Sequence, residues 1–245
     1  MSKKKIGKRQ HIREKRRRQA QIQRFGIIGL VAVGAVLVAF ALIYPNLKSA
    51  AELATVEAYP RPMADSTAMG DPNAPVIIDV FEDFQCPACA YYTEEVEKRI
   101  SETYVASGQV YYVFHHYPFI DNYSTSKESQ QAANASMCAM EQDLFWEYHD
   151  ILFANWNGEN AGAFRDERLM VFAETLELDI DLFTTCFEED RYQDEIQADY
   201  ELGVEMGVSG TPSVFINGEQ TTPGKIPGFD DIQQAVEAAL IQAGQ

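Results

Sequence analysis

Residues 76–89 read VIIDVFEDFQCPAC, an apolar run followed by two cysteines two residues apart. Apolar residues at helical spacing come next, so the two thiols lie at a predicted junction between a strand and a helix. At a helix N-terminus, unpaired N–H groups and the helix dipole stabilise a thiolate. We therefore expect Cys86 to be the reactive sulfur of a reversible disulfide and Cys89, one turn further on, to be its buried partner.

Two cysteines at this spacing also form half of many zinc sites, which usually need a second close pair of ligands. The remaining cysteines, Cys138 and Cys186, lie far apart and outside any such pair. The sequence therefore favours redox chemistry over zinc, and we predict no metal and no cofactor. A copper-delivery module that uses Cys86 and Cys89 as soft ligands is the alternative from another class of protein.

The N-terminus has the pattern of a membrane anchor. Residues 1–24 hold eleven basic residues and one acidic residue, and residues 25–44 carry no charge. As a helix, the uncharged run extends about 30 Å, the hydrocarbon thickness of a bilayer. The positive-inside rule keeps the basic segment in the cytoplasm and places the rest of the chain outside it. We expect a single-pass protein of the cell membrane with an extracytoplasmic catalytic domain.

A cleaved signal peptide is the competing interpretation, because residues 49–51 are small and suit a cleavage site. The apolar run is long for a signal core of about 7–15 residues, so we favour an uncleaved anchor. Both interpretations export the remainder of the chain, where disulfides persist. That remainder, residues 49–245, holds 36 acidic and 8 basic residues. Its charge argues against a nucleic-acid partner and leaves the N-terminal helix as the expected membrane contact.

Residues 45–69 contain several prolines among small and polar residues and are interpreted as a linker. The following segment, residues 70–243, has the length of one domain. Strand patterns before the cysteines, at 109–117 and at 212–217 are separated by the helix after the cysteines and by a helical block at about 124–205. A final helix follows at 229–243. This order predicts an α/β fold with a helical insertion.

The third predicted strand begins with Thr211 and Pro212. A proline at the head of an apolar strand belongs at a strand start or at a sheet edge. From these residues alone, a trans proline that opens the strand is the simpler interpretation. The alternative is a cis peptide that leaves the Thr211 backbone free to pair with a partner chain.

Taken together, these features resemble the DsbA-like, thioredoxin-fold thiol-disulfide oxidoreductases, in the branch with a membrane anchor or lipobox and a helical insertion. Four stretches in the same order carry the resemblance, which covers residues 70–243: GDPNAPV at 70–76, DFQCPAC at 83–89, FWEYHD at 145–150 and GVSGTPS at 207–213. It implies a thioredoxin-like α/β fold with an inserted helical domain, preceded by a single transmembrane helix.

The resemblance also implies roles for individual residues. Cys86 is expected to be the attacked and attacking sulfur, with Cys89 as its buried partner. The Thr211-Pro212 peptide is expected to be cis and to lie against the disulfide, where the Thr211 backbone pairs with an extended substrate. Pro87 and Ala88, between the cysteines, are expected to influence the redox potential.

Two residues depart from the family pattern. Ala88 stands where many DsbA-like proteins carry a histidine that stabilises the thiolate, which argues against a very strongly oxidising potential. Val80 stands six residues before the first cysteine, where the family places a buried acid. Glu82 and Asp83 are the nearby candidates to relay protons to Cys89.

Cys138 and Cys186 allow two interpretations, a pair of buried thiols or a structural disulfide across the helical insertion. Export favours the disulfide, and some members of the resembled family carry a second bridge at similar places. The resemblance implies an oxidoreductase that introduces disulfides into exported client proteins with free thiols. It further implies a quinone-linked membrane partner of the DsbB or vitamin K epoxide reductase type that reoxidises the enzyme. A disulfide reductase or isomerase is the alternative within the class.

Overall fold

The computed structural model describes residues 17–18, 21, 27–29, 33–38, 40, 53–54 and 58–244. The chain divides into two units, Met1–Leu53 and Ala54–Gln245. In the first unit, no described helix has the length and apolarity that a membrane crossing needs. Most of the predicted basic segment 1–24 and half of the predicted transmembrane helix 25–44 lie outside the described residues, so both stay predictions.

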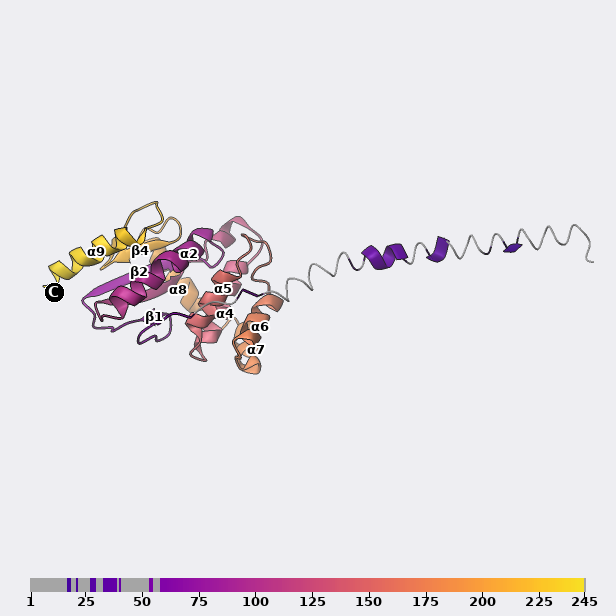
Figure 1. The fold of residues 1–245 in the computed structure, drawn as a ribbon, viewed down its shortest axis with the longest axis horizontal. Helices are drawn as coiled ribbons and strands as arrows, with labels where there is room; N and C mark the ends of the chain where they lie inside the picture. The colour runs from indigo at the N-terminus through magenta and orange to yellow at the C-terminus, as the bar shows by residue number, and fades with distance from the viewer. Residues whose placement is uncertain are drawn as a thin grey trace, which may run out of the picture. The chain divides into compact units, whose positions relative to one another are not determined.

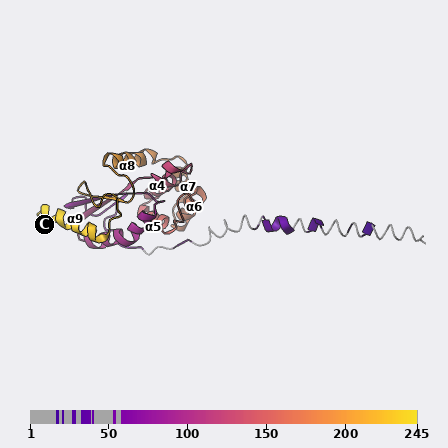
Figure 2. The ribbon, with the colours of Figure 1, turned by 90° about the horizontal axis from the view of Figure 1, so that it is seen from above.

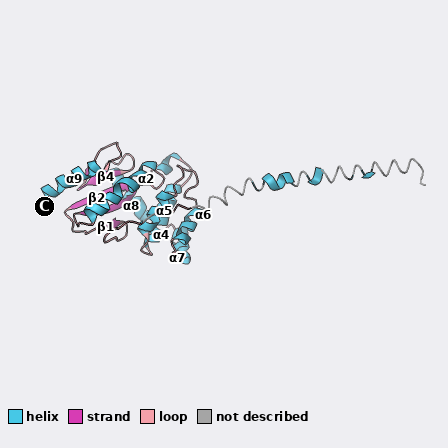
Figure 3. Ribbon diagram, viewed as in Figure 1, coloured by secondary structure: helices cyan, strands magenta, loops and turns pink. Residues whose placement is uncertain are grey.

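Within the described residues of the second unit, five strands form one sheet in the order β1-β3-β2-β4-β5 (Figures 1 and 3). The two central strands, β2 and β3, run parallel, and the other pairings are antiparallel. Because parallel neighbours need a crossover, the helix that follows the cysteines connects them. The strands are β1 (Ala68–Met69), β2 (Val76–Glu82), β3 (Val110–His116), β4 (Ser213–Ile216) and β5 (Glu219–Gln220).

The two central strands present different side chains to the two faces of the sheet, because strand residues alternate. On β2, Val80 and Glu82 share one face, which the cysteine helix covers, while Phe81 points to the other. Phe81 packs there with Tyr117, Val208 and Phe215. Figure 2 shows α8 (Gln193–Glu205) on one side of the sheet and α9 (Phe229–Gln242) on the other. Helices therefore cover both sides of the sheet, and alternate residues of β3 are buried on one face and half-buried on the other.

The crossover between β2 and β3 is helical from residue 87 to residue 105, but two of its turns are π-helical. A π-turn widens a helix locally, and such turns are frequent near functional sites. The first one ends at Glu97, two turns beyond the cysteine pair. In order, the segments are α2 (Pro87–Tyr92), the π-helix η1 (Thr93–Glu97), α3 (Lys98–Ile100) and the π-helix η2 (Ser101–Val105).

The helical insertion lies between β3 and β4, as the sequence predicts. It packs through aromatic side chains such as Tyr148, Phe172 and Phe183. A disulfide joins Cys138 on α4 to Cys186 on α7, so the bridge interpretation holds in the structure. The segments are η3 (Ile120–Tyr123, 3₁₀), α4 (Glu128–Met140), α5 (Phe145–Ala154), α6 (Asp166–Thr175), α7 (Ile180–Glu188) and α8.

The folded unit begins earlier than the sequence predicts. The sequence predicts a linker at residues 45–69, but Ala68 and Met69 pair with β3. Arg61 is buried as well, and its guanidinium forms ion pairs with Glu97 and Asp150. The prediction missed this segment because its contacts are with distant parts of the chain, which local periodicity does not report.

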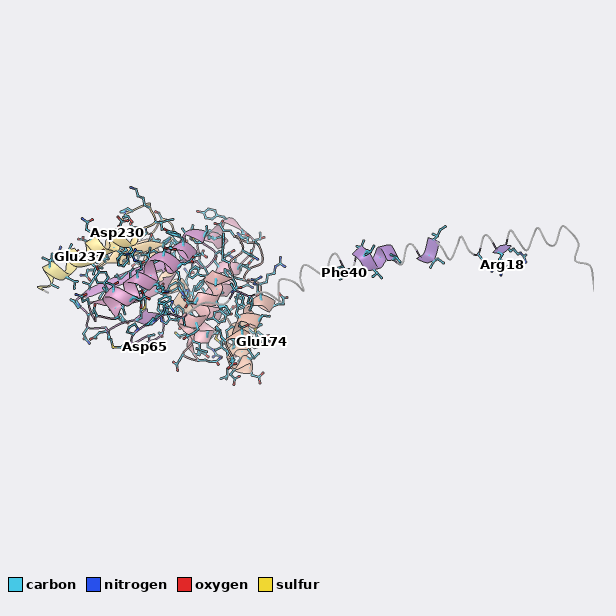
Figure 4. The ribbon with its side chains drawn as sticks, viewed as in Figure 1. Arg18, Phe40, Asp65, Glu174, Asp230 and Glu237 are labelled. Carbon is cyan, nitrogen blue, oxygen red and sulfur yellow. A yellow bond between two sulfur atoms is a disulfide. The ribbon has the colours of Figure 1, made fainter. Side chains whose placement is uncertain are left out.

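The surface of the unit is acidic, as its composition requires. Figure 4 labels four carboxylates there, and all four side chains are exposed: Asp65, Glu174, Asp230 and Glu237. Exposed like charges keep a protein soluble and repel anionic partners.

Candidate active site

The cysteine pair lies at the junction between the end of β2 and the start of α2. Cys86 is the N-cap of the helix, with an extended backbone, and Pro87 is its first residue. Proline suits that position because its fixed φ fits a helix and its missing N–H costs no hydrogen bond there. Pro87 is exposed and Ala88 is half-buried, whereas Cys86 is 6% exposed and Cys89 is fully buried. Both cysteines are free thiols, so the structure represents the reduced protein.

The second predicted site lies against the first. The Thr211-Pro212 peptide bond is cis. The Sγ of Cys86 lies 3.4 Å from the carbonyl oxygen of Thr211 and donates a hydrogen bond to it. The fold thus brings together residues that are 125 positions apart, and the strand β4 follows directly at Ser213. The Thr211 backbone thus lies directly beside the Cys86 sulfur.

The two thiols have different acidities. A hydrogen bond from the Cys89 thiol is the largest influence that lowers the pKa of Cys86 to about 6, against the effect of burial. The side chain of Thr211 and the N–H groups of residues 88 and 89 act in the same direction. Burial raises the pKa of Cys89 well above its usual value, and the hydrogen bond to Cys86 and the charge of Glu82 raise it further. Near pH 7, Cys86 is therefore mostly a thiolate and Cys89 holds its proton.

Glu82, not Asp83, is the acid at the buried cysteine. Glu82 is 1% exposed and its carboxyl interacts with the Cys89 thiol. Burial raises the pKa of Glu82 well above its usual value, with further contributions from the charges of Glu97 and Cys86. Alternation along β2 places Glu82 on the same face as Val80, so the acid is displaced by two residues and still reaches the cysteines. Glu82 can therefore exchange a proton with Cys89.

Asp83 has a structural role instead. One carboxylate oxygen accepts hydrogen bonds from the Gln85 N–H at 2.8 Å and the Ser129 hydroxyl at 2.7 Å, and the other accepts from the Ile120 N–H at 3.0 Å. The indole N–H of Trp156 donates to the Gln85 carbonyl at 2.7 Å. The helical insertion thus fixes the loop that leads into Cys86, and a rigid support keeps a reactive group in position.

A cluster of buried charges beneath the site was not predicted from the sequence. Glu97 accepts hydrogen bonds from the hydroxyl of Tyr59 and from Arg61, whose guanidinium also binds both oxygens of Asp150 at 2.6 and 2.9 Å. The sequence did contain one indication of this cluster. Glu97 follows Cys89 by eight residues, so at a spacing of four it lies on the same buried face of the helix as Cys89. A carboxylate on an apolar stripe indicates a buried partner of opposite charge.

Comparisons with known proteins agree with this geometry. A family model described as thioredoxin matches residues 63–238. The probable disulfide bond formation protein D of Bacillus anthracis is 27% identical over 175 residues, which cover 71% of this chain and 77% of that protein. A Na⁺/H⁺ antiporter, NhaA 3 of Salinispora tropica, is 34% identical over 151 residues, but these span 62% of this chain and only 21% of the antiporter.

The fold has solved counterparts. Oxidised BdbD from Bacillus subtilis superimposes with a TM-score of 0.65 at 20% identity, covering 77% of this chain and 100% of that chain. The family match includes both the cysteine pair and the Thr211-Pro212 peptide and spans more than half of the sequence. The chain therefore belongs to the thioredoxin family and is a DsbA-like thiol-disulfide oxidoreductase.

Proposed function

We propose that this protein is an exported, membrane-tethered oxidoreductase that forms disulfides in extracytoplasmic client proteins. The observation that carries the proposal is the acidity difference between Cys86 and Cys89. A stabilised Cys86 thiolate is a good leaving group and favours the reduced protein, so the oxidised protein tends to pass its disulfide on. The related protein of Bacillus anthracis carries disulfide bond formation in its name, which agrees with this direction.

The reaction follows from the geometry. A client thiolate attacks the Cys86 sulfur, the bond between Cys86 and Cys89 breaks, and Cys89 takes up a proton from Glu82. The client's second thiolate then attacks the client sulfur of the mixed disulfide and releases Cys86 as a thiolate. The client loses two electrons and the cysteine pair gains them. The Thr211 backbone, 3.4 Å from Cys86, holds the client segment beside the sulfur.

Reoxidation needs a second protein, which we propose to be a quinone-linked membrane protein of the DsbB or vitamin K epoxide reductase type. The N-terminal sequence supports a membrane location, because residues 1–24 are basic and residues 25–44 form an uncharged run long enough to cross a bilayer. Labelling of intact cells with a membrane-impermeant thiol reagent tests the topology. Cys86 of the reduced protein reacts if the domain is outside, and protection until the cells are lysed contradicts export.

The direction of exchange is tested with a reduced client that has two thiols. The oxidised full-length protein is expected to form one client disulfide per cysteine pair. The Cys89→Ala variant, loaded as a mixed disulfide through Cys86 with a small thiol, accumulates a trapped complex with a client variant that keeps only one thiol, because no second thiol can release Cys86. The Cys86→Ala variant gives none. If the reduced protein instead removes a disulfide from an oxidised client while the oxidised protein leaves reduced client unchanged, the protein is a reductase.

A further inference from the structure

A layer of buried polar side chains lies between the sheet and the helices that cover the cysteine side. Its titratable members are at most 2% exposed: Glu82, Tyr92, Glu97, Tyr112, His116 and His149. Among the described residues, no nitrogen or oxygen atom hydrogen-bonds the carboxyl oxygens of Glu82, whose polar neighbour is the Cys89 thiol. Buried polar atoms are almost always paired, so this layer is not an ordinary part of the core.

Glu97 is the member with the most partners. The hydroxyl of Tyr59 donates to it, the guanidinium of Arg61 lies 3.1 Å away, and the hydroxyl of Tyr112 lies 3.3 Å away. The Nε2 of His149 lies 3.7 Å from the same carboxylate. Four groups from the N-terminal segment, β3 and α5 therefore hold the Glu97 carboxylate in one place.

Glu97 and Glu82 occupy the same layer. Tyr112, which binds Glu97, is on β3 opposite Ile78, and its side chain shares the sheet face with Val80 and Glu82. The charge of Glu97 is the largest contribution after burial to the raised pKa of Glu82, and both carboxylates raise the pKa of Tyr92. The two acids therefore sense each other's charge across the buried layer.

We propose that Glu97 is a positioning residue for the redox reaction: its carboxylate, fixed by Tyr59 and Arg61, keeps the Glu82 carboxyl protonated while the cysteine pair is oxidised. A proton is then ready beside Cys89 when the client opens the disulfide. This inference rests on the proposed disulfide donation. Tyr59 and Arg61 precede the family match, which begins at residue 63, so the arrangement depends on the N-terminal segment of this chain.

The other groups that face Glu82 do not supply this charge. Cys86 and Cys89, on α2, do not titrate once they are joined in a disulfide. Tyr92 on α2 and Tyr112 on β3 stay neutral, because burial raises the pKa of each well above its usual value. His116, beside Glu82 on β3, is also neutral near pH 7, because burial lowers its pKa to about 4. Among the described residues, Glu97 is thus the charged group that acts on Glu82 in the oxidised protein.

The test is a carboxyl ¹³C NMR titration of the oxidised full-length protein, with the Glu82 signal assigned by its absence in Glu82→Gln. Glu97→Gln keeps hydrogen-bonding groups for Tyr59, Arg61 and Tyr112 but removes the charge. We expect it to lower the Glu82 midpoint by about one pH unit or more, because a removed like charge favours ionisation. Glu97→Met tests the same loss of charge by a second route.

Asp150→Asn is the matched control. Asp150 binds the same guanidinium, but its charge is not among those that act on Glu82. We expect this variant to leave the midpoint within about 0.3 pH units, and Arg61→Lys to do the same because the cation is kept. An unchanged midpoint in both Glu97 variants overturns the inference, and so does an equal fall in Asp150→Asn. Neither result bears on disulfide donation, which the client assay measures separately.

Discussion

The hydrogen bond between the two cysteine thiols is the main cause of the acidity of Cys86, and removing Cys89 tests it. A hydrogen bond to a charged group contributes about 1.5–3 kcal/mol. One pKa unit corresponds to about 1.4 kcal/mol, so losing this bond raises the pKa of Cys86 by about 1–2 units. We therefore expect a pKa that moves from about 6 in the wild type to about 7–8 in Cys89→Ala.

The assay is the ultraviolet absorbance of the thiolate measured against pH. The absorbance change reports Cys86 alone, because Cys138 and Cys186 form a disulfide and Cys86 is then the one titrating thiol of the Cys89→Ala variant. Cys89→Ser is the matched control, since its hydroxyl still donates to the thiolate and the pKa is expected to stay near 6. A pKa near 6 in Cys89→Ala refutes the reasoning, because the thiolate is then stabilised by the helix N-terminus and not by its partner thiol.

Three further predictions concern stability. Replacing Cys138 and Cys186 by alanine removes a bridge of sequence separation 48, which lowers the free energy of unfolding by at most about 4 kcal/mol in denaturant titrations and leaves the thiolate titration unchanged. Burial alone lowers the pKa of His115, but two neighbouring aspartates raise it to about 9. Its contribution to stability is therefore full below about pH 6.5 and is lost as the pH rises through 9, so the unfolding free energy falls by up to about 3 kcal/mol relative to His115→Gln. An equal pH dependence in both proteins contradicts this. Gly203→Ala places a methyl group 2.7 Å from the Tyr117 ring, so we expect a loss of about 1–3 kcal/mol by thermal unfolding, and wild-type stability refutes the close packing.

Local sequence patterns predicted the parts of the site that depend on local geometry. The spacing of Cys86 and Cys89 after an apolar strand predicts which sulfur begins the helix and which is buried, and the structure has this arrangement. The displaced acid was also within reach of sequence reasoning. Strand residues alternate, so Glu82 had to share the face of Val80 and Asp83 had to point away from it. The alternation of side chains along the strand therefore identifies Glu82, and not Asp83, as the acid on the cysteine side of the sheet.

Other features depend on contacts between distant segments and were not predictable from the sequence. Arg61 lies in a stretch without periodicity, and its partners Glu97 and Asp150 are 36 and 89 residues away. The linker prediction was wrong at residues 61–69 for this reason, since a proline-containing segment can be docked by one buried side chain, while residues 45–52 and 55–57 lie outside the described residues. The acidity of Cys86 likewise depends on the side chain of Thr211, a residue that lies 125 positions further along the chain.

The most direct test of the account is the reduction potential of the Cys86–Cys89 pair, measured by equilibrating the full-length protein with glutathione buffers. A Cys86 thiolate with a pKa of about 6 is more stable than that of thioredoxin, whose pKa is about 7, and less stable than that of DsbA, at about 3.5. Interpolation between the two proteins, at about −270 mV for thioredoxin and about −120 mV for DsbA, therefore predicts a potential of about −230 mV, about 40 mV more oxidising than thioredoxin. A potential near that of thioredoxin, about −270 mV, contradicts disulfide donation as the function of this protein.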